Sequence, residues 1–248
     1  ALEKKIPILQ PKKCTSLEVV KTLDELNSDV FIVVAFGQIL DKNLLTLPRH
    51  FCINLHSSLL PKYRGAAPIN WAIINGETKT GVTTMKMDTG LDTGNILLSS
   101  KVSISDADDA QSLHETLAHK GSSLVLETLR QLDSGLLEPI CQNSDLVSYA
   151  PKLKKEDGLI QWNQPAIKIH NLVRGLTPWP GAFSFLESKR FKVCKTEIKS
   201  CGSIDQPGVI ARLSGHGIEV GTKNERIVIT ELQPEGKKRM DVKSFLAG

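Results

Sequence analysis

The sequence is poor in aromatic residues and in cysteine, and it contains no long apolar run. Phe, Trp and Tyr make up 5% of the 248 residues, and the five cysteines are scattered without any Cys-x-x-Cys pair. An odd number of dispersed cysteines argues against a disulfide framework or a zinc site, so we expect free thiols in a reducing compartment. No apolar run approaches the roughly 20 residues of a membrane-spanning helix. The sequence therefore indicates no membrane partner.

Internal repeats, low-complexity segments and a strong charge of one sign are also lacking. The formal net charge is +4, a mildly basic value that is compatible with an RNA partner without indicating one. Apolar residues make up 40% and charged residues 23%, which is ordinary for a globular protein. The length suffices for one large domain or two smaller ones.

Two kinds of periodicity divide the chain. Residues 29–36 (DVFIVVAF) are continuously apolar and β-branched, which is typical of a strand buried on both faces of a parallel sheet. Amphipathic helices are expected at 16–27 and after the acidic cluster at 106–109, whose carboxylates suit a helix N-terminus better than a metal site. This half predicts an α/β, Rossmann-like domain with a mostly parallel sheet.

The later half has a different pattern. Helical periodicity stops near residue 135, and from 182 onward short strand-like runs alternate with Gly and Asn turns, which predicts a small OB-like β-barrel. We therefore expect an α/β domain at 1–135, a linker at 136–156 and a C-terminal barrel domain at 157–248.

A pair of polar side chains follows the strand FCINLH at 51–56. Asn54 and His56 lie two positions apart, so they share one face about 7 Å apart, close to a loop at the end of the strand. A carboxamide and an imidazole there could stabilise an oxyanion and move a proton. Asp92, in the loop DTGLDTG, could orient the imidazole. Each of these residues also has an ordinary structural interpretation, as a hydrogen-bonded strand-end histidine or as a turn former.

The motifs NLHSSLLPKYRGAAP, GVT at Gly81 and DTGLDTG from Asp88 closely resemble those of the 10-formyltetrahydrofolate-dependent formyltransferases. The resemblance covers nearly the whole chain. It implies that Asn54 and protonated His56 stabilise a tetrahedral oxyanion, that Asp92 pairs with His56, and that no metal or redox cofactor takes part. It also implies that 10-formyltetrahydrofolate is the formyl donor and that these residues bind it: Phe36, Gly37, Gln38, Ile39, Leu40, Ser57, Ser58, Leu59, Leu60, Pro61 and Asp88.

Three further motifs, RGAAPI, PWPGAF and QPEGKKRM, resemble the branch of this family that formylates initiator methionyl-tRNA. The resemblance implies a tRNA partner, a role in translation initiation, and a monomer in the bacterial cytoplasm, or in the mitochondrial matrix if the source is eukaryotic. The residues then expected to contact tRNA are Arg64, Lys152, Lys154, Lys155, Arg174, Lys237, Lys238 and Arg239. A solvated surface is the ordinary alternative for such lysines.

Two alternatives stay open. The chain could be another folate-dependent formyltransferase or hydrolase that acts on a small amine, or a catalytically silent RNA-binding module. Residues 1–10 predict the end of a helix and a short strand at 6–9. Because members of the family begin with a further strand and helix, we expect the sequence to be truncated at its N-terminus, without a loop that helps to grip the tRNA acceptor end.

Overall fold

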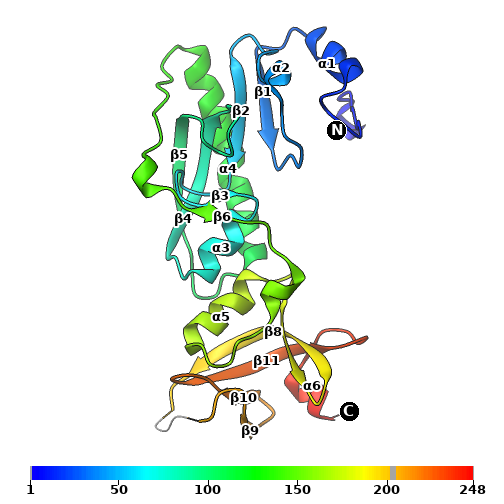
Figure 1. The fold of residues 1–248 in the computed structure, drawn as a ribbon, viewed down its shortest axis with the longest axis vertical. Helices are drawn as coiled ribbons and strands as arrows, with labels where there is room; N and C mark the ends of the chain where they lie inside the picture. The colour runs from blue at the N-terminus through cyan, green and yellow to red at the C-terminus, as the bar shows by residue number, and fades with distance from the viewer. Residues whose placement is uncertain (1, 202–204, 248) are drawn as a thin grey trace. The chain divides into compact units, whose positions relative to one another are not determined.

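A computed structural model of the chain describes residues 2–201 and 205–247. Packing divides the chain into two compact units, which we describe separately (Figure 1). The first unit comprises Ala1–Arg64, Val82–Ser100 and Gly121–Val147. The second unit comprises Gly65–Gly81, Lys101–Lys120 and Ser148–Gly248.

Helices and strands both occur in the first half of the chain, and strands dominate the second half. The helices are α1 (Leu17–Asp24), α2 (Lys42–Leu45), α3 (Pro68–Ile74), α4 (Ala110–Asp133), α5 (Ala166–Gly175) and α6 (Val242–Ala247), with short 3-10 helices at Leu2–Lys4, Ser144–Leu146 and Lys155–Gly158. The strands are β1 (Val30–Val34), β2 (Phe51–His56), β3 (Arg64–Gly65), β4 (Lys79–Lys86), β5 (Ile96–Ser103), β6 (Tyr149–Ala150), β7 (Ala182–Leu186), β8 (Lys189–Lys199), β9 (Ile210–Leu213), β10 (Ile218–Gly221), β11 (Arg226–Pro234) and β12 (Met240–Asp241).

The first unit is organised around a four-stranded sheet of order β1-β2-β4-β5. β1 runs parallel to β2, with Val30 opposite Phe51 and Val34 opposite Leu55. β2 runs antiparallel to β4, with His56 opposite Thr83. The α/β fold class is confirmed, and β4 joins the described strands in the antiparallel direction.

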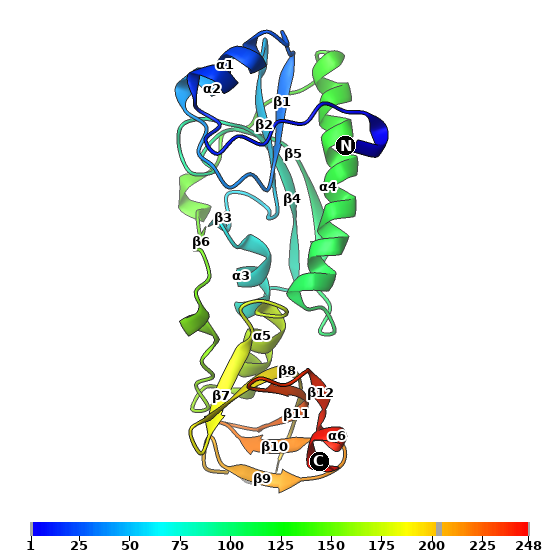
Figure 2. The ribbon, with the colours of Figure 1, turned by 90° about the vertical axis from the view of Figure 1, so that its right-hand side faces the viewer.

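Helix α4 covers one face of this sheet (Figure 2). A Cβ added at Gly121 would lie 2.6 Å from Leu55 Cδ2, so the helix approaches β2 closely there. The hydroxyl groups of Thr84 in β4 and Thr128 in α4 are 2.8 Å apart and hydrogen-bonded. Because strand side chains alternate between faces, Leu55 points toward α4 and its neighbour His56 points to the opposite face.

Two predictions are wrong: the short strand near the N-terminus, and the burial of the strand at β1 on both faces. Residues 6–10 form no strand, and their apolar side chains are exposed. The strand at β1 exists, but it is not buried on both faces, since Ile32 is 38% and Val34 54% exposed. β1 is the edge strand of the described sheet and pairs with β2 alone. Hydrophobicity alone could not reveal which neighbours the strand has.

The acidic cluster caps the N-terminus of α4, as expected. Asp109 Oδ1 accepts hydrogen bonds from the backbone N–H groups of Gln111 and Ser112, at 3.0 and 2.9 Å. Among the residues that the structure describes, no group of three or more His, Cys, Asp or Glu side chains could hold a metal ion. In the same part of the chain, no helix is long and apolar enough to cross a membrane.

The second unit contains a six-stranded antiparallel sheet of order β7-β8-β11-β10-β9, with β12 paired to β11. Helix α5 lies against β8 and buries Ile169 and Val173 in the core of the sheet. The expected series of short strands is confirmed, while its assignment to the OB type stays a prediction. None of the five cysteines forms a disulfide in the structure.

Candidate active site

The carboxyl end of β2 carries two polar side chains on the face of the sheet opposite α4. Asn54 and His56 lie two positions apart in this strand and project from the same face. Because β1 is parallel to β2, the segments that follow Val34 and His56 leave the sheet at the same edge. In open α/β sheets this edge is where ligands bind.

The imidazole of His56 lies between a backbone carbonyl and a carboxylate. Its Nε2 is 2.9 Å from the carbonyl oxygen of Tyr63, and its Nδ1 is 3.7 Å from Asp92 Oδ2. A carbonyl oxygen only accepts hydrogen bonds, so Nε2 carries a hydrogen. Nδ1 is therefore the nitrogen that can take up or release a proton. Its separation from Asp92 is that of an ion pair and is longer than a hydrogen bond.

Asp92 reaches His56 because the loop between β4 and β5 folds back along the sheet. The loop leaves β4 beside the start of β2, where Met87 N–H donates to the Cys52 carbonyl at 2.9 Å. His56 is the last residue of β2. The side chains of His56 and Asp92 are 6% and 14% exposed, so the loop shields the pair from solvent. The structure thus brings these two residues together, and their catalytic roles stay a prediction.

Asp88, expected to bind folate, stabilises this loop from within. Its Oδ1 accepts hydrogen bonds from Gly90 N at 2.9 Å and from Thr93 Oγ1 at 2.6 Å. Gly94 then packs so closely on the end of β4 that an added Cβ would overlap the Lys86 carbonyl oxygen. The Asp-Thr-Gly motif therefore has a structural function here, whether or not Asp88 also contacts a ligand.

The side chain of Asn54 is available to a ligand. It is partly buried, and its carboxamide makes no hydrogen bond to any residue that the structure describes. Cys52, on the same face of β2, is 1% exposed, and burial raises the pKa of its thiol to about 11. A thiol of that pKa stays protonated at neutral pH, which makes Cys52 a poor nucleophile.

The loop after β2, expected to bind folate through residues 57–61, is stabilised by its own hydrogen bonds. Ser58 is fully buried, and its hydroxyl donates to the Lys62 carbonyl at 2.6 Å. Thr83 Oγ1 donates to the Ser58 carbonyl at 2.7 Å and accepts from Leu60 N at 3.2 Å. The Ser58 hydroxyl is thus used inside the loop, whereas Ser57, Leu59 and Pro61 remain partly accessible.

The segment after β1, also expected to bind folate, is mostly open. Phe36 is 48% and Ile39 88% exposed, Gly37 is exposed, and Leu40 is partly buried. The side-chain Oε1 of Gln38 accepts a hydrogen bond from Cys14 N at 2.9 Å. Accessible apolar side chains at this edge suit a planar ring, and the contact itself stays a prediction.

The basic residues expected to bind tRNA fall into two groups. One group has free access to solvent and consists of Lys152, Lys154, Lys155, Lys237, Lys238 and Arg239, the last of which also pairs with Glu231 at 2.6 Å. Arg174 belongs to the other group: its Nη1 donates to the carbonyls of Ser105 and Asp108, and its Nη2 to Asn171 Oδ1. Burial lowers the pKa of this guanidinium. These contacts give Arg174 a structural role inside the second unit.

Arg64 is likewise buried, at 8% exposure, in the first unit. Its Nε and Nη2 donate to Gln142 Oε1 at 3.1 and 2.7 Å. No sequence pattern indicated Gln142 or Thr83, because each acts on a loop that is distant along the chain. The part played by the Tyr63 carbonyl was also missed, since backbone groups have no residue signature.

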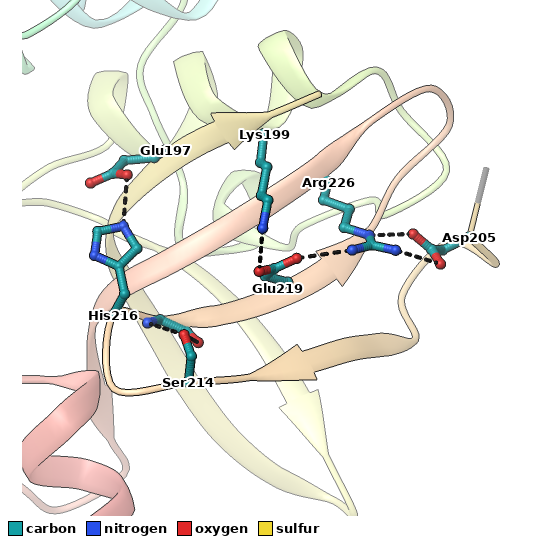
Figure 3. A network of polar contacts seen from close by, with 8 residues as sticks. Glu197, Lys199, Asp205, Ser214, His216, Glu219 and Arg226 are labelled. Atoms are coloured by element: carbon teal, nitrogen blue, oxygen red, sulfur yellow. Dashed lines mark hydrogen bonds and ion pairs between the residues drawn. The ribbon is translucent and has the colours of Figure 1, made fainter. Parts of the chain in front are cut away.

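A chain of ion pairs runs across the sheet of the second unit (Figure 3). Glu219 accepts from Lys199 Nζ at 2.7 Å and from Arg226 Nη1 at 3.0 Å, and Arg226 also pairs with Asp205. The hydrogen bond from Lys199, opposed by burial and aided by Arg226, holds the pKa of Glu219 below its ordinary value. Both cations are balanced by carboxylates, so this part of the sheet is not a free basic surface.

Comparisons with known proteins show the family of the chain. Residues 1–129 match the family described as Formyl transferase, and residues 152–248 match its C-terminal domain. The chain is 53% identical to a methionyl-tRNA formyltransferase of Geobacter metallireducens, over the whole of this chain and 79% of that protein.

Two solved structures share the fold. A methionyl-tRNA formyltransferase from Clostridium thermocellum has a TM-score of 0.59 at 22% identity, covering 77% of this chain and 81% of that one. HypX from Aquifex aeolicus, in complex with tetrahydrofolic acid, has a TM-score of 0.69 at 19% identity, covering 92% of this chain and 40% of that one. With the family matches and the identity to the Geobacter protein, these likenesses lead to one conclusion: the chain belongs to the formyltransferase family.

Proposed function

We propose that this protein transfers the formyl group of 10-formyltetrahydrofolate to the amino group of initiator methionyl-tRNA. The observation that carries the chemistry is the placement of His56, with Nε2 bound to a carbonyl and Nδ1 facing Asp92. The acceptor rests on the 53% identity to a protein named methionyl-tRNA formyltransferase. The donor rests on family membership and on the folate bound by the structurally similar HypX.

In the proposed reaction the methionyl nitrogen attacks the formyl carbon, and the formyl oxygen becomes an oxyanion. The carboxamide of Asn54 and the Nδ1–H of protonated His56 donate hydrogen bonds to that oxygen. Asp92 offsets the charge of the imidazolium across 3.7 Å. Nδ1 then gives its proton to the folate nitrogen as the carbon–nitrogen bond to the folate breaks, and it takes a proton from the new amide nitrogen, which restores the imidazolium.

Binding of the two substrates is proposed from exposure and from the family. Folate would lie along the edge formed by 36–40 and 57–61. The accessible lysines at 152–155 and 237–238, with Arg239, would contact tRNA phosphates. We further propose the domain limits 1–135, 136–156 and 157–248, which the family matches at 1–129 and 152–248 support. A monomer acting without a metal in the bacterial cytoplasm completes the proposal.

An acceptor assay tests the function directly. Purified protein is given 10-formyltetrahydrofolate with methionyl-tRNA, with a small primary amine such as an amino sugar, or with water alone. We expect formyl-methionyl-tRNA as the product and little turnover of the other two. Transfer to the small amine, or release of formate, would establish one of the alternative formyl enzymes. Binding of tRNA without any folate binding would establish the silent RNA-binding module instead.

A further inference from the structure

The side-chain amide of Gln142 makes four hydrogen bonds inside the first unit. Its Nε2 donates to the backbone carbonyls of Asp92 at 2.8 Å and Gly94 at 2.7 Å. Its Oε1 accepts from Arg64 Nε at 3.1 Å and Nη2 at 2.7 Å. Both amide hydrogens and the amide oxygen are therefore used: the hydrogens bind the loop that carries Asp92, and the oxygen binds Arg64.

The chemistry of these partners fixes the orientation of the amide. Arginine only donates hydrogen bonds and carbonyls only accept them, so Oε1 must face Arg64 and Nε2 must face the loop. A glutamate at 142 would accept from Arg64 but would repel both carbonyls. A methionine would fill the same space and bond to neither. Within this set of partners, a glutamine amide satisfies every group.

The backbone places Gln142 at the required position. Ile140 and Ile96 form an antiparallel bridge with two hydrogen bonds of 2.8 Å. In this antiparallel register, the residue two positions after Ile140, which is Gln142, lies opposite the residue two positions before Ile96, which is Gly94. The segment before β5 is thus clamped at Ile96 by backbone bonds and at Gly94 and Asp92 by a side chain.

Arg64 connects this clamp to the imidazole. The residue before it, Tyr63, supplies the carbonyl that accepts from His56 Nε2. Tyr63 and Arg64 are both buried, at 7% and 8% exposure. One short segment therefore orients His56 directly and orients Asp92 through Gln142. Both partners of the 3.7 Å ion pair are set from the same place.

We infer that Gln142, oriented by Arg64, is a positioning residue that holds the Asp92 carboxylate against His56 for formyl transfer. The inference rests on the proposed function, because it assigns Asp92 a part in the reaction. Gln142 itself touches no reacting atom in this scheme. Its loss should let the 88–94 loop relax, and a displacement of about 1 Å at a reacting centre costs on the order of 10²-fold in rate.

A double-mutant cycle with Asp92→Asn tests the inference. For Gln142→Met we expect kcat for formylation of methionyl-tRNA to fall about 10- to 100-fold, with both KM values within about twofold of wild type. In an Asp92→Asn background, measured by single turnover, the same change should lower the rate by less than about threefold, because its target is already gone. Gln131→Met, which removes a surface amide bonded to Glu127, is the matched control and should leave kcat unchanged.

The outcomes separate the two claims. An equal fall in both backgrounds would show a general structural effect and overturn the inference, as would a wild-type kcat for Gln142→Met. If Asp92→Asn alone is as fast as wild type, the proposed role of Asp92 fails, and the inference with it. Arg64→Lys is a second test in case Gln142→Met does not fold. The lysine keeps the positive charge but cannot make the two-nitrogen contact to Gln142. It should lower kcat about 3- to 10-fold, and this effect should likewise disappear in the Asp92→Asn background. An Arg64→Lys effect that persists in the Asp92→Asn background would also overturn the inference.

Discussion

Replacement of Thr83 by valine would test how the loop beside the active site is held. Thr83 is fully buried in β4, and its hydroxyl joins the Ser58 carbonyl to the Leu60 amide. Valine has nearly the same shape but cannot form either bond. The substitution therefore isolates the hydrogen bonds from the packing.

The expected cost follows from the two bonds and their burial. Each hydrogen bond contributes about 1 kcal/mol net, and a buried group left without a partner costs about 1–3 kcal/mol. Ser58 is 0% and Leu60 7% exposed, so water reaches neither group easily. We expect Thr83→Val to destabilise the first unit by about 2–4 kcal/mol. That range corresponds to a rise of roughly 30- to 700-fold in the equilibrium constant for opening of the loop.

Hydrogen exchange followed by mass spectrometry measures this locally. Peptides that cover residues 57–63 should lose protection by that factor. Tryptophan fluorescence would be uninformative, because Trp71, Trp162 and Trp179 all lie in the second unit. Thr230→Val is the control, since Thr230 Oγ1 is buried without a partner among the described residues and its removal should be neutral or stabilising. Unchanged protection at 57–63 in Thr83→Val would refute the reasoning.

Two further predictions concern charges in the second unit. Glu219→Gln should lower Tm at pH 7. The hydrogen bond from Lys199 depresses the folded-state pKa of Glu219. The ionised Glu219 carboxylate therefore adds to the free energy of unfolding at pH values above the ordinary glutamate pKa, and this stabilisation is lost as pH falls through the folded-state pKa. Wild type and variant should therefore converge in Tm scans toward pH 3, and a gap that stays constant from pH 7 to pH 3 would contradict this account. Arg174→Lys should lower Tm yet leave the salt dependence of tRNA binding unchanged, whereas Lys154→Glu should reduce the slope of log Kd against log salt by about one or more. Anisotropy titrations of tRNA binding at several salt concentrations measure this slope. A reduced slope for Arg174→Lys would show that Arg174 contacts tRNA after all.

The sequence predicted the parts of the site that depend on local pattern. Alternation along 51–56 placed Asn54 and His56 on one face, and the family motif named Asp92 as their partner. The residues that position them were not predictable in this way. Arg64 and Gln142 are 78 residues apart in the chain, and Gln142 lies in a segment interpreted as a linker. Only the folded chain shows that these two side chains meet.

Side-chain type was also a poor guide to which polar groups can bind a ligand and to which apolar residues are buried. Arg174 carries a charge that suits tRNA, but its Nη1 and Nη2 donate to neighbouring carbonyls and to Asn171. The Ser58 hydroxyl, in a loop expected to bind folate, is used by Lys62. The apolar strand β1 lies at the edge of the described sheet, with Val34 54% exposed. In each case the outcome depends on neighbours that are distant in sequence or on local hydrogen bonds without a motif.

The measurement that tests the central claim most directly is the single-turnover rate of formyl transfer to methionyl-tRNA by Asn54→Ala. Loss of one oxyanion donor should slow transfer by about 10²- to 10³-fold, or roughly 3–4 kcal/mol, with folate binding retained. Asn43→Ala, an exposed asparagine of α2, should transfer at the wild-type rate. A near-wild-type rate for Asn54→Ala would contradict the proposed role of this edge of the sheet in the reaction.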